Sequence, residues 1–305
     1  MTEMNKEIKE LVIISGKGGT GKTSITAAFA ALAENAVLAD CDVDAADLHL
    51  ITGPRIERRE EFRCGHEAGI RQKDCISCGA CLARCRFRAV RKSEGGAGEA
   101  NFTIDPTACE GCGVCVWSCP VKAIDFPERT SGEWFISSSR YGTLVHARLN
   151  PGAENSGKLV SIVRRQAQRI ANEQHCSLIL IDGPPGIGCP VIASVTGASL
   201  LLIVTEPTLS GAHDTLRVLK LARHFTIPAV VCVNKWDINP TITEQIEKEA
   251  KENNGLPAGR IRYDQLVTEA LIHGKPVVEL DGSLAGVDIR LVWNLVETML
   301  KEELT

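Results

Sequence analysis

The sequence has no long hydrophobic run and little net charge. It contains no stretch of about 18 consecutive apolar residues, the length that a membrane-spanning helix requires. Its first residues, Met1 to Glu10, are polar and charged and lack the apolar core of a secretory signal. The net charge of −4 at pH 7 does not suggest a protein that coats nucleic acid or an anionic membrane. These absences predict a cytoplasmic protein with neither a nucleic-acid nor a membrane partner.

Cysteine is the one residue type present in unusual number. The chain has 13 cysteines in 305 residues, within a composition that is otherwise ordinary for a globular protein, at 44% hydrophobic and 24% charged residues. In a secreted chain they would suggest disulfides. Without an export signal, a reducing compartment and metal ligation are favoured instead.

Eight of the cysteines form two runs with the spacing C-x2-C-x2-C-x3-C: Cys75, Cys78, Cys81 and Cys85, then Cys109, Cys112, Cys115 and Cys119. This spacing is that of bacterial ferredoxins, in which the fourth cysteine of each run binds the other cluster. The two 4Fe–4S ligand sets expected are therefore Cys75, Cys78 and Cys81 with Cys119, and Cys109, Cys112 and Cys115 with Cys85. Structural zinc is the alternative, although zinc sites commonly use two well-separated C-x2-C pairs.

The cysteine runs lie in a segment, residues 55–128, that we predict to be an inserted domain. It has an internal duplication, because residues 74–81 and 108–115 match in their cysteine and glycine positions. Between Arg55 and Lys92 there are eleven Lys or Arg against five Asp or Glu. This excess of basic residues is either a docking face for an acidic electron-transfer partner, or it compensates the negative charge of the clusters or tunes their potential.

A glycine-rich loop lies upstream of this segment, at residues 16–23. It follows a strand-like run, Leu11 to Ile14, and precedes a helical stretch of residues 23–34, the context that a phosphate-binding loop requires. Glycines allow backbone N–H groups to approach phosphate oxygens, a lysine binds the terminal phosphates and a hydroxyl binds Mg²⁺. The nucleotide contacts predicted are Gly16, Gly18, Gly19, Thr20, Gly21, Lys22, Thr23 and Ser24.

Strands and helices alternate outside the insert. The strands expected are residues 36–40, 144–149, 178–182, 200–205 and 229–234, and the helices expected are residues 158–174, 212–224, 241–253 and 285–303. The pattern predicts an α/β P-loop NTPase domain, residues 1–54 and 129–305, with a mostly parallel sheet flanked by helices. The insert is predicted to be an α+β domain of bacterial-ferredoxin type.

The loop contains a second lysine, Lys17, and so resembles the deviant Walker A loop of the MinD/ParA group of ATPases. That group includes the nitrogenase iron protein and the Mrp-type cluster carriers, and one subgroup has a two-cluster ferredoxin domain inserted at this point. The resemblance implies that Lys17 reaches the partner's nucleotide in a dimer, either a homodimer or a heterodimer of related chains. It also implies that Lys17, Lys22 and Asp42 are catalytic, with Asp42 orienting or deprotonating the attacking water.

The same resemblance assigns further contacts to the ends of predicted strands. It implies that Thr23, Asp40 and Asp182 bind Mg²⁺ and that Asn234 and Asp264 lie at the base. ATP and ADP are favoured over guanine nucleotides, although Asp237 is similar to the guanine-reading aspartate of GTPases.

Three functions remain open. The first is a nucleotide-driven dimer that couples ATP hydrolysis to electron transfer with a redox partner. The second is a cluster scaffold that delivers clusters to a metalloprotein, although the sequence has no C-x-x-C outside the insert. The third is spatial positioning of the MinD or ParA kind. Cys189 is read as a packed or switch-sensing thiol, with a cluster shared between subunits as the alternative.

Overall fold

The chain forms two compact units. The computed structural model describes residues 8–94, 100–153 and 156–302. The larger unit consists of Met1–Glu60, Glu133–Arg148 and Ser156–Thr305, and the smaller unit of Glu61–Gly132 and Leu149–Asn155. The main segment of the smaller unit begins and ends a few residues later than the predicted insert of residues 55–128. The two long strands that lead into and out of it, β3 (Arg55–His66) and β8 (Glu128–Ser139), have residues in both units.

A nine-stranded sheet is built around the first strand. Its order is β13-β12-β11-β1-β10-β2-β9-β8-β3, and the neighbours from β13 to β9 are parallel. The remaining strands of this sheet are β1 (Lys9–Ile14), β2 (Ala36–Asp40), β9 (Gly142–Leu149), β10 (Leu178–Asp182), β11 (Leu200–Thr205), β12 (Ala229–Asn234) and β13 (Leu256–Ile261).

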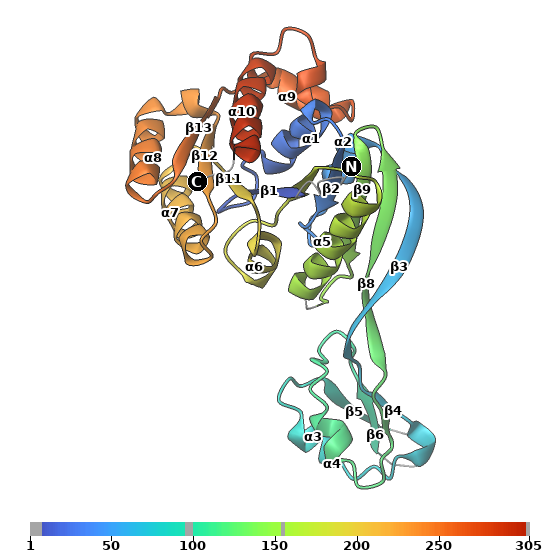
Figure 1. The fold of residues 1–305 in the computed structure, drawn as a ribbon. Helices are drawn as coiled ribbons and strands as arrows, with labels where there is room; N and C mark the ends of the chain where they lie inside the picture. The colour runs from blue at the N-terminus through green and yellow to red at the C-terminus, as the bar shows by residue number, and fades with distance from the viewer. Residues whose placement is uncertain (1–7, 95–99, 154–155, 303–305) are drawn as a thin grey trace. The chain divides into compact units, whose positions relative to one another are not determined.

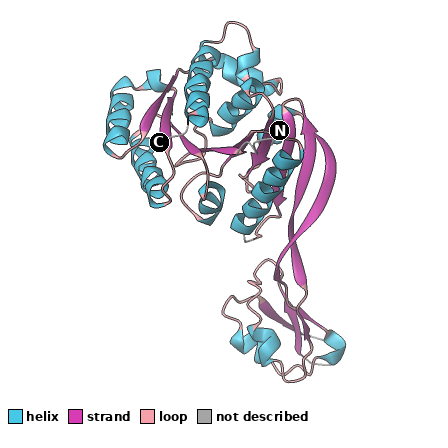
Figure 2. Ribbon diagram, in the orientation of Figure 1, coloured by secondary structure: helices cyan, strands magenta, loops and turns pink. Residues whose placement is uncertain are grey.

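Helices cover both faces of the sheet, and the predicted parallel sheet with flanking helices is confirmed (Figures 1 and 2). One face carries α1 (Lys22–Leu32), α2 (Leu48–Thr52), α9 (Gln265–Ile272) and α10 (Leu284–Lys301). The other carries α5 (Ser156–Glu173), α6 (Cys189–Val195), α7 (Leu209–His224) and α8 (Pro240–Glu252). Because both faces are covered, the central strands are buried along almost their whole length, and they consist almost entirely of Leu, Ile, Val and Ala.

The core under α1 and α10 is continuous. Phe29 and Trp293 meet there with ring centroids 4.9 Å apart, and both pack with strand residues such as Leu38 and Leu202. Burial of each large apolar side chain contributes about 1.5–3 kcal/mol. This packing fixes the carboxyl ends of the strands, and with them the loops that follow.

Several elements were not expected from the sequence. They are α2, β3, β8, β13, α6 and α9. In β3 most side chains are exposed and charged, so the strand lacks the alternating pattern by which strands are recognised. In β13, Pro257 and Gly259 interrupt the pattern, and both are tolerated because β13 is an edge strand.

The described residues of the smaller unit form two antiparallel strand pairs and two short α-helices. The pairs are β4 (Gly69–Ile70) with β7 (Ile124–Asp125), and β5 (Val90–Glu94) with β6 (Ala100–Ile104). The helices are α3 (Ala80–Arg84) and α4 (Val114–Ser118), and they pack against each other. Their shared core includes Cys81, Val90, Phe102 and Ile124. Short helices of 3-10 type occur at Gln72–Asp74 in this unit and at Trp236–Ile238 and Val277–Glu279 in the larger one.

None of the helices in residues 8–94, 100–153 and 156–302 has the length and apolarity needed to cross a bilayer.

Candidate functional site

The ends of three central strands bring the predicted catalytic and magnesium-binding residues together. Strand register pairs Ile13 with Asp182, and Asp182 with Asp40. The glycine-rich loop begins directly after Ile14, so it lies at the same edge of the sheet. In an open α/β sheet, ligands bind at the carboxyl ends of the strands, where this edge lies.

Three glycines of the loop, Gly16, Gly19 and Gly21, are required by its shape. Gly19 and Gly21 have φ of 86° and 87°, in the left-handed region that favours glycine. A Cβ on Gly21 would lie 2.5 Å from Nδ2 of Asn234, and one on Gly16 would lie 2.3 Å from Cβ of Asp214. The Asn234 amide donates to the Thr20 carbonyl at 2.8 Å and so ties the end of β12 to the loop.

Lys22 lies at the centre of an ion-pair network at the start of α1. Its Nζ is 2.8 Å from Asp182 Oδ1 and 3.5 Å from Asp42 Oδ2. Asp182 also accepts hydrogen bonds from the hydroxyls of Thr23, at 2.7 Å, and Thr26, at 3.0 Å. Burial lowers the pKa of Lys22, but Asp182 and Asp42 raise it by more, so it lies above its ordinary value and the ammonium stays charged.

Three carboxylates gather around this lysine. Asp40 is fully buried and accepts hydrogen bonds from the backbone N–H groups of Asp42 and Leu48. Its pKa is raised well above its ordinary value, first by burial and then by the charge of Asp182. Burial also raises the pKa of Asp42, although Lys22 opposes that shift. Carboxylates beside a threonine hydroxyl form the oxygen-rich donor set that Mg²⁺ prefers.

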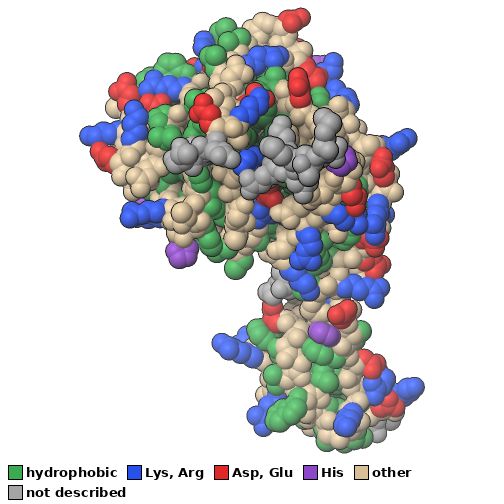
Figure 3. Space-filling model, viewed as in Figure 1, with side chains coloured by type: hydrophobic (Ala, Val, Ile, Leu, Met, Phe, Trp, Pro, Cys, Tyr) green, Lys and Arg blue, Asp and Glu red, His purple; other side chains and the backbone are tan. Residues whose placement is uncertain are grey.

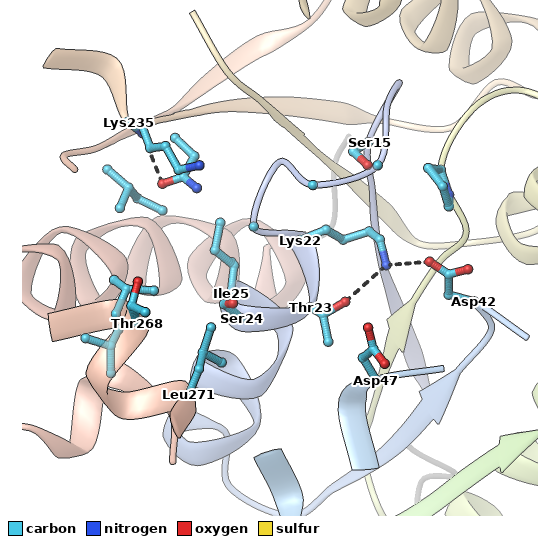
Figure 4. Close-up of a pocket in the computed structure, with 18 of the residues that line it drawn as sticks. Ser15, Lys22, Thr23, Ser24, Ile25, Asp42, Asp47, Lys235, Thr268 and Leu271 are labelled. Atoms are coloured by element: carbon cyan, nitrogen blue, oxygen red, sulfur yellow. Dashed lines mark hydrogen bonds and ion pairs between the residues drawn. The ribbon is translucent and has the colours of Figure 1, made fainter. Parts of the chain in front are cut away.

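A cavity of about 650 Å³ opens beside the loop (Figure 4). Its volume lies within the range of small-molecule sites. Polar loop and strand-end residues line one part, and apolar residues such as Val267 and Leu271 of α9 line another. The Thr20 hydroxyl is buried and has no hydrogen-bond partner in the described structure. A phosphate oxygen at the loop would give it a partner, so the loop fits a nucleotide.

The predicted base-contact residues differ in how they are used. Asn234 and Asp264 both line the cavity. The Asp264 carboxylate, however, accepts from the Leu266 N–H at the start of α9 and from the Ser283 hydroxyl before α10. Burial raises the Asp264 pKa, but these bonds lower it by more, and it falls below its ordinary value. Asp237, the residue similar to the guanine-reading aspartate of GTPases, accepts a hydrogen bond from the Tyr263 backbone N–H at 2.7 Å. Its carboxylate therefore holds the loop after β13.

Lys17 is exposed in the loop. Its backbone carbonyl accepts a 2.7 Å hydrogen bond from the Ser15 hydroxyl. Within the part of the chain that the structure describes, no carboxylate forms an ion pair with its ammonium group. Ser24 lines the cavity directly after Thr23.

The eight cysteines of the two runs line two separate small cavities of the smaller unit. Cavity A is lined by Cys75, Cys78, Cys81 and Cys119. Cavity B is lined by Cys85, Cys109, Cys112 and Cys115. These are the two sets expected from the spacing of the runs. Across residues 8–94, 100–153 and 156–302, no group of three or more His, Cys, Asp or Glu side chains is arranged to hold a metal ion.

The duplication in the sequence is repeated in the backbone of the smaller unit. Both short helices follow a left-handed glycine, Gly79 or Gly113. Each helix is followed by the fourth cysteine of its run, whose sulfur accepts a backbone N–H: Ala89 to Cys85 at 3.3 Å and Ala123 to Cys119 at 3.2 Å. Each half also places a cation at positive φ three residues after that cysteine. The two halves can therefore be compared position by position.

Sequence reasoning did not identify several residues of the nucleotide cavity. Thr26 donates to Asp182, and Asp47, Thr268 and Leu271 line the cavity. Thr268 and Leu271 belong to the unexpected helix α9. Asp264 caps the start of that helix, and an aspartate before a helical stretch is a recognised start signal that could have revealed it.

Cys189 is exposed at the start of α6, next to Gly157.

The sheet order, the loop and the carboxylates at the strand ends define a P-loop nucleotide-binding protein. The CbiA family, described as the CobQ/CobB/MinD/ParA nucleotide binding domain, matches residues 11–277. The chain belongs to this family and is a P-loop ATPase of MinD/ParA type.

Individual proteins resemble the chain to different degrees. The uncharacterized protein MJ0578 of Methanocaldococcus jannaschii is 39% identical over 76% of this chain and 80% of its own length. The uncharacterized protein MJ0579 of the same organism is 25% identical over 76% of this chain and 82% of its own. The solved structure of the septum site-determining protein MinD with Mg-ADP, from Pyrococcus horikoshii, has a TM-score of 0.57 at 15% identity. That match covers 97% of this chain and 100% of MinD, and it shows a shared fold.

Proposed function

We propose that this ATPase couples nucleotide turnover in a dimer to electron transfer through two 4Fe–4S clusters. The observation that carries the proposal is the crossed grouping of the cysteines, with three from one run and the fourth from the other around each cavity. That grouping is how two-cluster ferredoxins bind their clusters. The proposal does not need thiols that converge on one ion, because in a cluster each cysteine binds a different iron.

The residues at the nucleotide site would have different roles in ATP hydrolysis. Lys22 would bind the terminal phosphates of ATP. Thr23 and Asp182 would hold Mg²⁺, and Asp40 would lie near the ion. The raised pKa of Asp42 suits it to accept a proton from an attacking water. Lys17 would add positive charge when two chains meet, since its side chain is exposed.

The smaller unit supplies the electron-transfer part. Bound clusters would accept and release single electrons, and backbone N–H groups on Cys85 and Cys119 would tune their potential. The partner would be a redox protein. Delivery of clusters to a metalloprotein remains the alternative.

Two measurements on anaerobically purified protein test the proposal. The first is the iron and sulfide content, which we expect to be about eight of each per chain. The second is the ATP hydrolysis rate with the protein oxidised and reduced, in the wild type and in Lys22→Ala as the inactive control. Coupling predicts that reduction changes the wild-type rate. Equal rates in protein that contains iron would show that hydrolysis and electron transfer are independent.

Absence of iron would remove the electron-transfer proposal altogether. MinD of Pyrococcus horikoshii is described as a septum site-determining protein. A positioning role of that kind would then be the function left for this ATPase.

A further inference from the structure

The segment that follows α3, beside cavity B, differs in charge from the segment that follows α4, beside cavity A. Three arginines alternate with Cys85 and Phe87 where α3 ends: Arg84, Arg86 and Arg88. The duplication places Ser118, Pro120 and Lys122 at the equivalent positions after α4. From residue 82 to 92 the chain has five Arg or Lys and no Asp or Glu, whereas the equivalent residues 116–126 have one of each sign.

The three arginines are exposed, and no carboxylate of the described residues forms an ion pair with them. Other arginines of the smaller unit do have partners: Arg71 pairs with Asp74, and Arg91 pairs with Asp105. Arg84, Arg86 and Arg88 therefore form an unneutralised basic surface, which we call the arginine surface. Basic and hydrophobic side chains are both visible on the exterior of this unit (Figure 3).

Compensation of cluster charge does not explain the arginine surface. Each cavity is lined by four cysteines, so clusters bound in both would carry the same charge. The half around α4 nevertheless builds the same turn and the same N–H to sulfur bond with a single cation, Lys122. The fold and the cysteines thus do not require the extra arginines.

An exposed aromatic side chain lies among the arginines. Phe87 is 42% exposed and lines cavity B, so it lies both at the surface and beside the four cysteines. Aromatic and arginine side chains are enriched at the centres of protein interfaces, and charge complementarity speeds encounter. An acidic protein surface would match this arrangement, because its carboxylates would pair with the arginines.

We propose that the arginine surface docks an acidic one-electron carrier protein and that cavity B is where electrons are exchanged with it. This rests on the proposed function, since it requires a cluster in cavity B. One electron passes between the carrier and the cluster, so one is oxidised as the other is reduced, and no bond forms or breaks.

Flavodoxin, an acidic one-electron carrier, is the probe for the test. Its binding to the anaerobic holoprotein is measured by fluorescence titration, and electron transfer from its reduced form by stopped-flow absorbance, at low and high ionic strength. We expect both to weaken as salt rises. We expect the flavodoxin affinity and the electron-transfer rate to fall by about tenfold or more at low salt in the triple variant Arg84→Glu, Arg86→Glu and Arg88→Glu. The same three positions changed to Lys should keep most of the binding.

The matched control carries the same change in charge on the larger unit: Arg165→Glu, Lys220→Glu and Lys251→Glu, on exposed sites of α5, α7 and α8. It should bind flavodoxin within about twofold of the wild type. An equal loss of flavodoxin binding in both triple variants would overturn the docking proposal. So would electron-transfer rates of the iron-loaded wild type that do not change with ionic strength. Neither result would argue against the clusters themselves. Wild-type protein without iron would instead overturn the proposed function on which it rests.

Discussion

The ammonium group of Lys22 lies 2.8 Å from Asp182, although the two residues are 160 positions apart in the sequence. The pair joins the start of α1 to the end of β10, and both side chains are almost completely buried. A buried ion pair of this kind adds little to stability by itself, but loss of one partner leaves an uncompensated charge. The contact therefore makes stability and nucleotide binding depend on the same lysine.

Replacement of this lysine should destabilise the protein and abolish ATP hydrolysis. In Lys22→Ala, the carboxylates of Asp40, Asp42 and Asp182 face one another without a cation. We expect the free energy of unfolding at pH 7 to fall by about 3 kcal/mol, as measured in urea. Mg²⁺ should restore part of it, because the cation replaces the missing charge. Lys220→Ala, at an exposed position on α7, should change stability by less than about 0.5 kcal/mol.

A methyl group on Gly21 should distort the loop. Gly21→Ala would place its Cβ 2.5 Å from the Asn234 amide, which must then move away from the Thr20 carbonyl. We expect ATP affinity, measured by calorimetry, to fall by tenfold or more, about 1.4 kcal/mol. The matched control is Gly197→Ala, which has a similar φ of 77° but no neighbour within 4 Å. It should cost about 1 kcal/mol of stability and leave affinity unchanged; equal affinity losses in both variants would contradict the steric explanation.

Much of the larger unit could be predicted because its strands are buried on both faces. Four strands, including β2 and β10, have the bounds expected from their apolar runs. The glycine-rich loop and the ends of those strands then gave the candidate site. Contacts that depend on tertiary structure, such as Thr26 with Asp182, left no pattern in the sequence. The pairing of β3 with β8 was also hidden, because the exposed, charged side chains of β3 follow no apolar period.

Arg262 should matter for nucleotide affinity more than for the rate of hydrolysis. Its guanidinium binds both oxygens of buried Asp288, at 2.7 and 2.8 Å, and so fixes the loop that lines the cavity. Arg262→Ala should raise KM for ATP several-fold and change kcat by less than about twofold, because its guanidinium pairs with Asp288 and not with the carboxylates around Lys22. Arg260→Ala removes a similar two-point contact, with Glu247, outside the cavity. A KM that rises equally in both variants would indicate general destabilisation.

His146 should make the protein less stable in mild acid. Burial, with a smaller effect of His49, lowers its pKa to about 4, and the two rings stack 5.8 Å apart. An unfolded histidine titrates near 6.5, so the unfolded state binds the proton more readily. The stability that depends on neutral His146 is therefore fully present above about pH 6.5. It is lost as the pH falls towards 4, by about 3 kcal/mol in all.

Urea unfolding at pH 7 and pH 4.5 measures this loss. His146→Gln keeps a polar group near the Ser137 hydroxyl but does not titrate, so its stability should fall less between the two pH values. His213→Gln, at an exposed site on α7, should behave like the wild type. A wild type and a His146→Gln variant with the same pH dependence would exclude His146 as the source.

The crossed cysteine sets predict which variants should resemble each other. Cys119 follows Cys115 in the sequence, yet it lines cavity A with the first run. If it binds that cluster, Cys119→Ser and Cys78→Ser should affect the same cluster and give matching paramagnetic resonance spectra of the reduced protein. Iron content in each should fall from about eight to about four per chain, because one cluster is lost and the other stays.

Cys85 provides the reciprocal test for cavity B. Cys85→Ser should match Cys112→Ser and differ from the first pair, since cavity B holds Cys85 with the second run. Cys176→Ser, a buried cysteine of the larger unit, should keep all the iron. Spectra that pair Cys119→Ser with Cys112→Ser would mean that each run binds its own cluster. That result would leave iron in the protein but exclude the crossed arrangement. Cys85, which lies between Arg84 and Arg86, would then not bind the cluster in cavity B.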